Sequence, residues 1–196
     1  MRFSKLILAT NNRHKIAELT ALLDGAGVTI LTKADFSDFP EIEETANTLA
    51  ENALEKSRTI FRKYGIPAVA DDTGLEVDSL GGAPGVYSAR YAGEGCTFAD
   101  NNRKLLQELE GVPVERRRAR FVTVIGVTYT GGEVCLEGDV DGYIATEPRG
   151  DNGFGYDPVF VYQPLGKTFA EMDSKMKNIV SHRAVALGKF KDWLLS

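Results

Sequence analysis

The sequence predicts a mixed α/β fold, and three patterns lead to this prediction. An apolar run at residues 5–10 is followed at once by apolar residues at helical spacing, as in a strand that leads into a helix. A second apolar run, residues 69–77, follows a long amphipathic segment, as in a right-handed β-α-β unit. Later, two strand-like runs, residues 120–129 and 133–138, flank Thr130-Gly131-Gly132, which indicates an antiparallel hairpin. We therefore expect a mixed sheet that combines parallel strands with an antiparallel ribbon and is flanked by helices.

The composition is that of one globular domain. The chain has 196 residues, enough to bury a full core, and its 43% hydrophobic and 26% charged residues are ordinary values. No run approaches the roughly 20 apolar residues that a membrane-spanning helix needs, and no signal peptide is recognisable. Cys96 and Cys135 stand alone without metal-ligand spacing, which suits a reducing compartment. We expect a single domain, residues 1–196, that is cytoplasmic and has no membrane partner.

The charge of the chain bears on its partners. The net charge is −5, so overall charge gives no basis for binding nucleic acid. The arginines at positions 116–118 and Arg120 lie between a turn and a strand, and we expect a solvated edge there. An anionic ligand would therefore need a local cationic patch.

The link after the first strand is a candidate anion site. Asn11 or Asn12 can cap the helix that follows, which places residues 10–15 at its positive end. Backbone N–H groups at such an end point outward, and Lys15 adds a full positive charge. The alternative is a capped amphipathic helix whose polar residues simply face water.

Acidic residues precede the second helix, which we expect to begin near Thr48 with Glu51 completing a capping box. Glu43 and Glu44 lie just before this helix start. They either complement the helix dipole or act as metal ligands together with acids elsewhere in the fold.

Asp71 and Asp72 follow an apolar run, and we expect the strand to end there, before a turn at Thr73 and Gly74. Burying an unpaired carboxylate is costly, so a cation should meet at least one of the two. Hard carboxylate oxygens at a strand end suit Mg²⁺. The alternative is a junction in which Asp72 makes an Asx-turn and Asp71 faces solvent.

Two later segments offer groups that could hold a flat polar ligand. Gly153 and Gly155 flank Phe154, which leaves its ring accessible, and stacking of a base on such a ring contributes about 1–3 kcal/mol. The terminal helix is expected to open at residues 177–183, with Ser181 as its cap. Its donors Lys177, His182 and Arg183 could bind the polar edge of a ligand, or they are ordinary charges at a surface helix end.

Together these features predict a nucleotide-binding enzyme. An anion site with a lysine and a carboxylate cluster suited to Mg²⁺ would serve the phosphates, while an aromatic loop and a group of donors would serve the base. No serine or cysteine lies in a recognisable nucleophile motif, so we expect water to attack. Either Asp71 or Asp72 would then orient or deprotonate it.

These motifs, taken in order, resemble the inosine triphosphate pyrophosphatase family. The resemblance runs from the first strand to the last helix, and the segments that carry it are residues 10–15, 43–45, 51–53 with Lys56, 70–75, 84–91, 153–158 and 181–183. It implies Mg²⁺-dependent cleavage of ITP, dITP or XTP to the monophosphate and pyrophosphate by attack of water at the α-phosphorus. It also implies an elongated mixed sheet between two lobes, an active site in the cleft between them, and a homodimer.

The resemblance also implies roles for particular residues. Glu44 and Asp72 would hold the metal, with Glu43 and Asp71 as alternatives, and Asp72 would be the general base, assisted by Lys15. Residues 10–15 would bind the phosphates, residues 154–157 would line the base pocket, and the donors near the terminal helix would recognise the keto edge of the purine. The substrate-binding residues would be Thr10, Asn11, Asn12, Arg13, His14, Lys15, Lys56, Thr73, Phe154, Gly155, Tyr156, Asp157, Lys177, His182 and Arg183.

The chain departs from the family pattern at three positions. Asn11 and Ala46 stand where glycine is usual, and Thr73 stands where serine is usual. Asn11 tolerates left-handed geometry and Thr73 keeps a hydroxyl, so we expect altered affinity rather than lost function. Two other functions stay open: a pyrophosphatase for modified pyrimidine nucleotides, like the septum-inhibitor-like enzymes, and a non-catalytic nucleotide-binding module.

Overall fold

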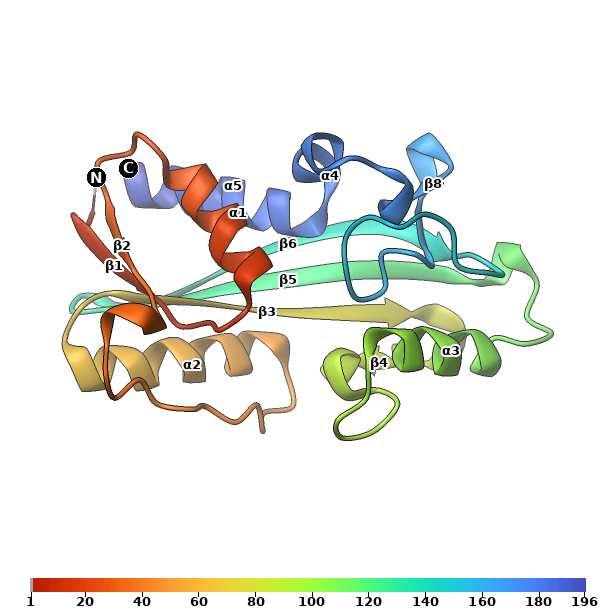
Figure 1. Cartoon of the computed structure of the whole chain (residues 1–196), viewed down its shortest axis with the longest axis horizontal. Coiled ribbons are helices and arrows are strands. Elements are labelled where there is room, and N and C mark those ends of the chain that lie inside the picture. Colours follow the sequence, from red (N-terminus) through yellow and green to blue (C-terminus); the bar gives the residue numbers. More distant parts are fainter. Residues whose placement is uncertain (1) are drawn as a thin grey trace. The chain divides into compact units, whose positions relative to one another are not determined.

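The computed structural model describes residues 2–196, which form a mixed α/β fold (Figure 1). The strands are β1 (Lys5–Leu8), β2 (Thr29–Leu31), β3 (Ala68–Val77), β4 (Pro84–Gly85), β5 (Arg118–Tyr129), β6 (Gly132–Ile144), β7 (Phe160–Tyr162) and β8 (Lys167–Thr168). The α-helices are α1 (Arg13–Leu23), α2 (Leu49–Tyr64), α3 (Phe98–Glu108), α4 (Ser174–Val180) and α5 (His182–Leu195). In this described range, no helix is both long and apolar enough for a membrane span.

The strands pair in the order β2-β1-β3-β5-β6-β7-β8, and β4 pairs with β3. Strand β1 runs parallel to β2 and β3, whereas β7 runs antiparallel to β6 and β8. Strands β5 and β6 are joined by the two residues Thr130 and Gly131, the connection of an antiparallel hairpin. The predicted mixed sheet with helices is confirmed.

The chain divides into two compact units, and β3, β5 and β6 contribute residues to both. Unit 1 comprises the described part of Met1–Asp72 together with Thr123–Gly138 and Val185–Ser196. Unit 2 comprises Thr73–Val122 and Asp139–Ala184.

The core of unit 1 lies on both faces of its strands. Leu6 and Leu8 of β1 pack in one cluster with residues of α1 and α5, while Ile7 packs in another with Ile60 of α2. Figure 1 accordingly shows α2 on one side of β1 and β3, and α1 and α5 on the other. This alternation follows from the two-residue period of a strand that is covered on both faces.

Strand β3 does not end at its acidic pair, so that prediction was wrong. The strand continues past Asp72 to Val77, and the element that ends beside the acids is β1, whose last pair with β3 joins Leu8 to Val69. Because side chains alternate along a strand, Asp71 shares the face of Val69 and Asp72 shares the face of Ala70. The two carboxylates are therefore directed to opposite faces of β3, one toward α1 and one toward α2.

The core of unit 2 is rich in aromatic rings. Phe121 of β5 meets Phe160 of β7 edge-on, with 4.8 Å between ring centroids, and stacks on Phe169 at 6.1 Å. Helix α3 adds Leu105 and Leu109, both fully buried, to the same cluster. The cluster gives unit 2 a rigid interior against which the loop at residues 153–157 is built.

The start of the terminal helix differs from the prediction. Lys177 belongs to a separate short helix, α4, and α5 begins only at His182. Between them, Ser181 has an extended backbone, which ends α4, and its hydroxyl accepts a hydrogen bond from the backbone N–H of Ala184 at 3.2 Å. Ser181 is thus the predicted cap, but it caps a helix that excludes Lys177.

Helix α2 has one of the two hydrogen bonds of the predicted capping box. The Thr48 hydroxyl accepts a hydrogen bond from the N–H of Glu51 at 3.1 Å, as expected. The Glu51 carboxylate instead pairs with Arg58, at 2.6 Å. The first turn of α2 is therefore capped from one side only.

The arginine cluster is only partly the solvated edge that we expected. Arg116 and Arg118 are exposed, but Arg117 is 6% exposed. Its guanidinium donates to the carbonyl oxygens of Leu109, Val112 and Ala145 at 2.8–3.0 Å. The prediction fails for Arg117 because three backbone acceptors replace its water shell, so this side chain stabilises the end of α3.

Candidate functional site

The first candidate group lies in unit 1 and consists of Glu44, Asn52, Lys56 and Asp72, which we call the acidic cluster. Helix α2 supplies Asn52 and Lys56, four residues apart and hence on one face of the helix. One Asp72 oxygen accepts from the Asn52 amide at 3.1 Å, and the other lies 3.2 Å from the Lys56 ammonium. Asp72 is only 6% exposed, so these two donors replace most of its water.

Lys56 joins the two carboxylates of the acidic cluster. Its ammonium lies 2.8 Å from a carboxylate oxygen of Glu44 and 2.8 Å from the backbone carbonyl of Asp71. Burial disfavours the charge of Lys56, but Asp72 and Glu44 outweigh it and raise its pKa. Lys56 therefore stays cationic, and its Nζ atom contacts the carboxylates of both Glu44 and Asp72.

The pKa of Asp72 is raised above that of an ordinary aspartate. Burial is the main cause, the charge of Glu44 adds to it, and the charges of Lys56 and Lys15 together with the Asn52 hydrogen bond oppose it. A carboxylate whose proton affinity is increased in this way is better suited to accept a proton than a solvated one.

One observation fits a magnesium ion at the acidic cluster. Glu44 and Asp72 converge on one ammonium, so two carboxylates face a single positive charge. Mg²⁺ is commonly held by one or two carboxylates, with water and substrate phosphates completing its shell. Within residues 2–196 no group of three or more His, Cys, Asp or Glu side chains is placed to hold a metal, so an all-protein cage is not what this region offers.

The alternatives for the metal ligands occupy different surroundings. Glu43 is exposed, whereas Glu44 contacts Lys56. The carboxylate of Asp71 pairs with Lys15 of α1 at 2.9 Å, on the opposite face of β3 from Asp72. The structure thus groups Glu44 with Asp72 and leaves Glu43 and Asp71 outside that group.

The loop before α1 is capped more fully than the sequence suggested. Asn12 is the N-cap, and its side-chain oxygen accepts from the N–H groups of His14 and Lys15 at 3.0 and 3.4 Å. The hydroxyl of Thr10 accepts from the N–H of Asn12 at 3.2 Å. Three backbone donors expected to point outward are therefore engaged within the loop, while Lys15, which pairs with Asp71, and the helix dipole place positive charge there. Asn11 and Arg13 are exposed beside them.

The second candidate group lies in unit 2 and is built on the loop at residues 153–157, which we call the aromatic loop. One carboxylate oxygen of Asp157 accepts from the N–H of Phe154 at 2.7 Å and pairs with the Lys177 ammonium. Gly153 has φ +77°, and a Cβ there would lie 2.0 Å from that same oxygen. Glycine is therefore required at this position, both for the backbone and for the space that Asp157 fills.

Two cations lie over the ring of Phe154. The Lys177 ammonium is 4.8 Å from the ring centroid, and the guanidinium carbon of Arg183 is 5.5 Å from it. Arg183 also donates to the hydroxyl of Thr73 at 3.3 Å, and Thr73 is the residue that follows Asp72 in β3. The structure thus brings Phe154, Asp157, Lys177, Arg183 and Thr73 of unit 2 into one group.

Of the remaining predicted residues of this group, His182 and Tyr156 are buried and Gly155 is half-buried. The ring of His182 is 3% exposed and stacks on Phe121. Tyr156 is 4% exposed, its hydroxyl donates to the carbonyl of Ser88 at 2.9 Å, and burial raises its pKa. The carbonyl of Gly155 accepts from the Asn102 amide at 3.0 Å. Tyr156 and Gly155 therefore also anchor the aromatic loop to the rest of unit 2.

Sequence reasoning gave no role to two residues that hold these groups in place. Asn52 is 1% exposed, and it accepts from the N–H of Ala46 at 3.0 Å while it donates to Asp72. Asn102 is 7% exposed and holds the aromatic loop. The available signal was an amide on the buried face of an amphipathic helix, where a polar side chain must have specific partners.

Comparison with known proteins shows the family to which the chain belongs. Residues 6–193 match the model of the Ham1 family. The chain belongs to the Ham1 family. Among its relatives are proteins named dITP/XTP pyrophosphatase: that of Thermoanaerobacter sp. strain X514 is 51% identical over 97% of this chain and 96% of its own. That of Geobacter sulfurreducens is 48% identical over the same shares of the two chains.

Solved structures of the family support the fold. A HAM1 protein from Coxiella burnetii has a TM-score of 0.92 with 40% identity over 98% of both chains. The Ham1 protein of Staphylococcus aureus has a TM-score of 0.89 with 36% identity over 97% of both. The resemblance drawn from the sequence motifs is confirmed at the level of family and fold.

Proposed function

We propose that this protein hydrolyses deaminated purine nucleoside triphosphates, namely ITP, dITP and XTP, to the monophosphate and pyrophosphate. The observation that carries the proposal is the buried carboxylate of Asp72, held by Asn52 and sharing Lys56 with Glu44. The relatives named dITP/XTP pyrophosphatase, about half identical over nearly the whole chain, support the choice of substrate.

The acidic cluster would serve the phosphates. Glu44 and Asp72 would hold Mg²⁺, which when bound supplies positive charge against the triphosphate. Lys56 carries a raised pKa and stays charged, so it would add to this neutralisation. Lys15, paired with Asp71, and the positive end of α1 would bind further phosphate oxygens, together with the polar residues 10–14.

Asp72 would act as the general base. It would accept a proton from the water whose oxygen bonds to the α-phosphorus, while the bond from that phosphorus to the bridging oxygen breaks and pyrophosphate leaves. Burial raises the pKa of Asp72, which brings its proton affinity closer to that of an effective base at neutral pH. Thr73, next along β3, would contact the substrate.

The aromatic loop would serve the base. The ring of Phe154 would stack on the purine, and Lys177, His182 and Arg183 would donate to its 6-keto oxygen. The same donors would face the 6-amino group of ATP and lose their acceptor. Mismatches of this kind discriminate by about 10⁴-fold or more in sites built on hydrogen bonds. A strong preference for ITP over ATP is the result.

A cytoplasmic homodimer completes the proposal. The chain has a family resemblance that implies a dimer, and its two cysteines carry no disulfide in the described residues. Sedimentation of the purified protein measures the oligomeric state independently of activity.

One assay panel tests the function. Pyrophosphate release is measured with Mg²⁺ from ITP, XTP, dUTP, ATP and GTP, and again after addition of EDTA. The proposal expects release from ITP and XTP, little from ATP and GTP, and loss of activity with EDTA that Mg²⁺ restores. Release mainly from dUTP would indicate a pyrimidine enzyme, and ITP binding without release would indicate a non-catalytic module.

A further inference from the structure

We propose that Phe121 is a positioning residue for base selection, because its ring fixes the plane of the His182 imidazole. The inference rests on the proposed function, in which His182 contacts the purine. It adds a residue of strand β5 that none of the motifs singled out.

The two rings form a close parallel stack. Their centroids are 4.3 Å apart and their planes differ by 8°. Phe121 is 5% exposed and His182 is 3% exposed, so neither ring is free to swing into solvent. The backbone of His182 is fixed as well, since it is the first residue of α5 and Ser181 caps that helix.

Phe121 is itself held rigidly. It lies within β5, and the face of its ring stacks on Phe169 at 6.1 Å between centroids, whereas Phe160 meets it edge-on at 4.8 Å and does not share its plane. Phe169 also lies 6.1 Å from the His182 ring, with 24° between the planes. The imidazole therefore packs against close-packed aromatic rings, and the sheet determines the positions of these rings.

The plane of an imidazole sets the direction of its hydrogen bonds, because both nitrogens donate or accept within that plane. Hydrogen bonds weaken steeply when their angle departs from linear. A tilt of His182 would misdirect its polar atom from the base, and displacements of about 1 Å in such sites cost about 10²-fold. The stack with Phe121 thus links a core residue to discrimination between keto and amino purines.

The test compares two leucine substitutions in the same aromatic cluster. Phe121→Leu removes the ring that stacks on His182, whereas Phe160→Leu removes a fully buried ring that packs on Phe121. We expect Phe121→Leu to lower the ITP-over-ATP ratio of kcat/KM about 10–100-fold. Phe160→Leu should lower the unfolding temperature by a similar amount and keep the ratio within about threefold of wild type.

A double-mutant cycle separates positioning from general loosening of the core. If Phe121 acts through His182, Phe121→Leu changes the ratio no further in a His182→Ala background. Equal loss of selectivity in Phe121→Leu and Phe160→Leu, or an undiminished effect of Phe121→Leu in the His182→Ala background, would overturn the inference. Should Phe121→Leu fail to fold, Phe121→Met, which fills the space without an aromatic face, replaces it in the same comparison.

The outcome is distinguishable from failure of the proposed function. If wild-type protein releases no pyrophosphate from any nucleotide, the proposed function fails and the inference about Phe121 fails with it. If wild type prefers ITP and Phe121→Leu keeps that preference, the function stands and the inference fails.

Discussion

The acidic cluster of unit 1 and the aromatic loop of unit 2 each hold a buried lysine against a buried aspartate, but their surroundings differ. Lys56 serves Asp72, Glu44 and a backbone carbonyl, so two carboxylates share one ammonium. Lys177 serves the single carboxylate of Asp157 and lies over the ring of Phe154. The first arrangement has an excess of negative charge and suits a divalent cation. The second has two cations, Lys177 and Arg183, for one carboxylate, and offers an aromatic face with donors.

One kind of ion pair, a buried lysine with a buried aspartate, can thus support two kinds of chemistry. Where a second carboxylate joins the pair, the group can hold a metal and accept a proton. Where rings join it, the group can stack on a base and read its polar edge. Substitutions in the acidic cluster should therefore change rates for every substrate alike, whereas those in the aromatic loop should change the ranking of substrates.

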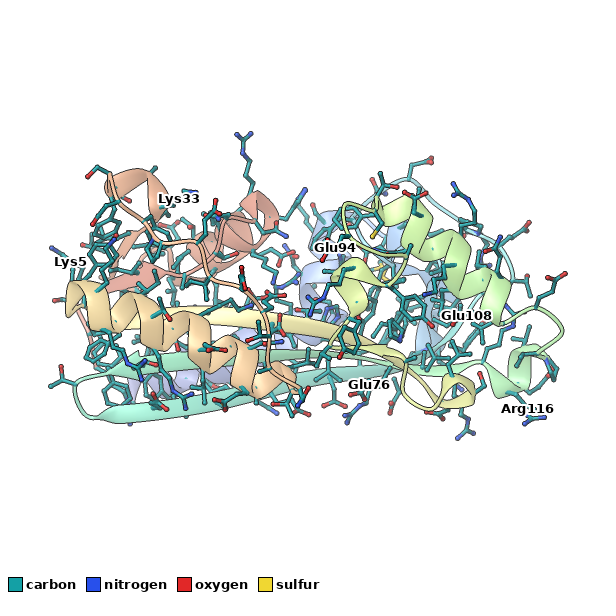
Figure 2. All side chains as sticks on the ribbon, turned by 90° about the horizontal axis from the view of Figure 1, so that it is seen from below. Lys5, Lys33, Glu76, Glu94, Glu108 and Arg116 are labelled. Atoms are coloured by element: carbon teal, nitrogen blue, oxygen red, sulfur yellow. The ribbon has the colours of Figure 1, made fainter. Side chains whose placement is uncertain are left out.

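The largest expected effect is that of Asp72→Asn. Loss of the proposed general base should lower kcat by about 10²–10⁴-fold for ITP while the protein stays folded, because the amide has the same shape and Lys56 keeps Glu44 as a partner. Steady-state kinetics and thermal unfolding check both parts. Glu76→Gln is a matched control on the same strand, where Glu76 (labelled in Figure 2) forms a surface pair with Arg120. Near-wild-type turnover in Asp72→Asn would reassign the base.

Asn52→Leu should have the next largest effect. It removes the hydrogen bonds that join Ala46, beside Glu44, to Asp72, and loss of such supporting contacts typically costs about 10–100-fold in metal affinity or activity. The Mg²⁺ concentration that gives half the maximal rate should rise by a similar factor. Ser57→Ala on the same helix loses the hydrogen bonds of the hydroxyl to Thr128 and to the carbonyl of Leu54, neither of which belongs to the acidic cluster. If both variants respond to Mg²⁺ alike, the supporting role of Asn52 is refuted.

Gly153→Ala tests the aromatic loop. A left-handed backbone costs a non-glycine residue about 1–2 kcal/mol, and the new methyl group would also collide with Asp157. Gly166→Ala has a similar φ, +61°, with no atom within 4 Å of the added Cβ, so it carries the strain alone. We expect Gly153→Ala to be the less stable variant in chemical denaturation and to lose part of its preference for ITP. A preference equal to that of Gly166→Ala would contradict the assignment of this loop to the base.

The smallest effect concerns Glu171, whose carboxylate accepts from the N–H of Thr168 at 2.7 Å, next to Phe169. This hydrogen bond lowers the pKa of Glu171, with help from Arg149. A lowered folded-state pKa adds stability above the ordinary pKa of the group, and that stability is lost as pH falls through the folded value. Wild type should therefore unfold at a higher temperature than Glu171→Gln near about pH 7, and the difference should shrink toward about pH 3. A difference in unfolding temperature that grows on acidification would contradict this prediction.

Much of this could be predicted from the sequence, for physical reasons that differ between elements. The helix caps at Asn12 and Thr48 and the hairpin turn are local, since each depends on residues only a few positions apart. The position at which β3 ends, by contrast, is not determined by nearby residues alone. Whether a strand stops at Asp72 depends on which neighbours pair with it, and β4 pairs with β3 at Leu75 and Glu76, beyond the last pair with β1.

The candidate site divides in the same way. The spacing of Asn52 and Lys56 along α2 is a local property, but their contact with Asp72 depends on how the helix lies on the strand. The stack of His182 on Phe121 joins residues about sixty positions apart, and neither residue carries a signal of the other. Arg117 likewise looked like its exposed neighbours until three carbonyl acceptors were seen around it.

The most direct test of the division between rate and selectivity is the ITP-over-ATP ratio of kcat/KM, measured side by side in Asp72→Asn and His182→Ala. The account predicts that Asp72→Asn loses activity toward both nucleotides by a similar factor and keeps its ratio. It predicts that His182→Ala lowers the ITP-over-ATP ratio about 10–100-fold, as expected when one hydrogen-bond donor to the base is removed. A collapsed ratio in Asp72→Asn, or an unchanged ratio in His182→Ala, would contradict it.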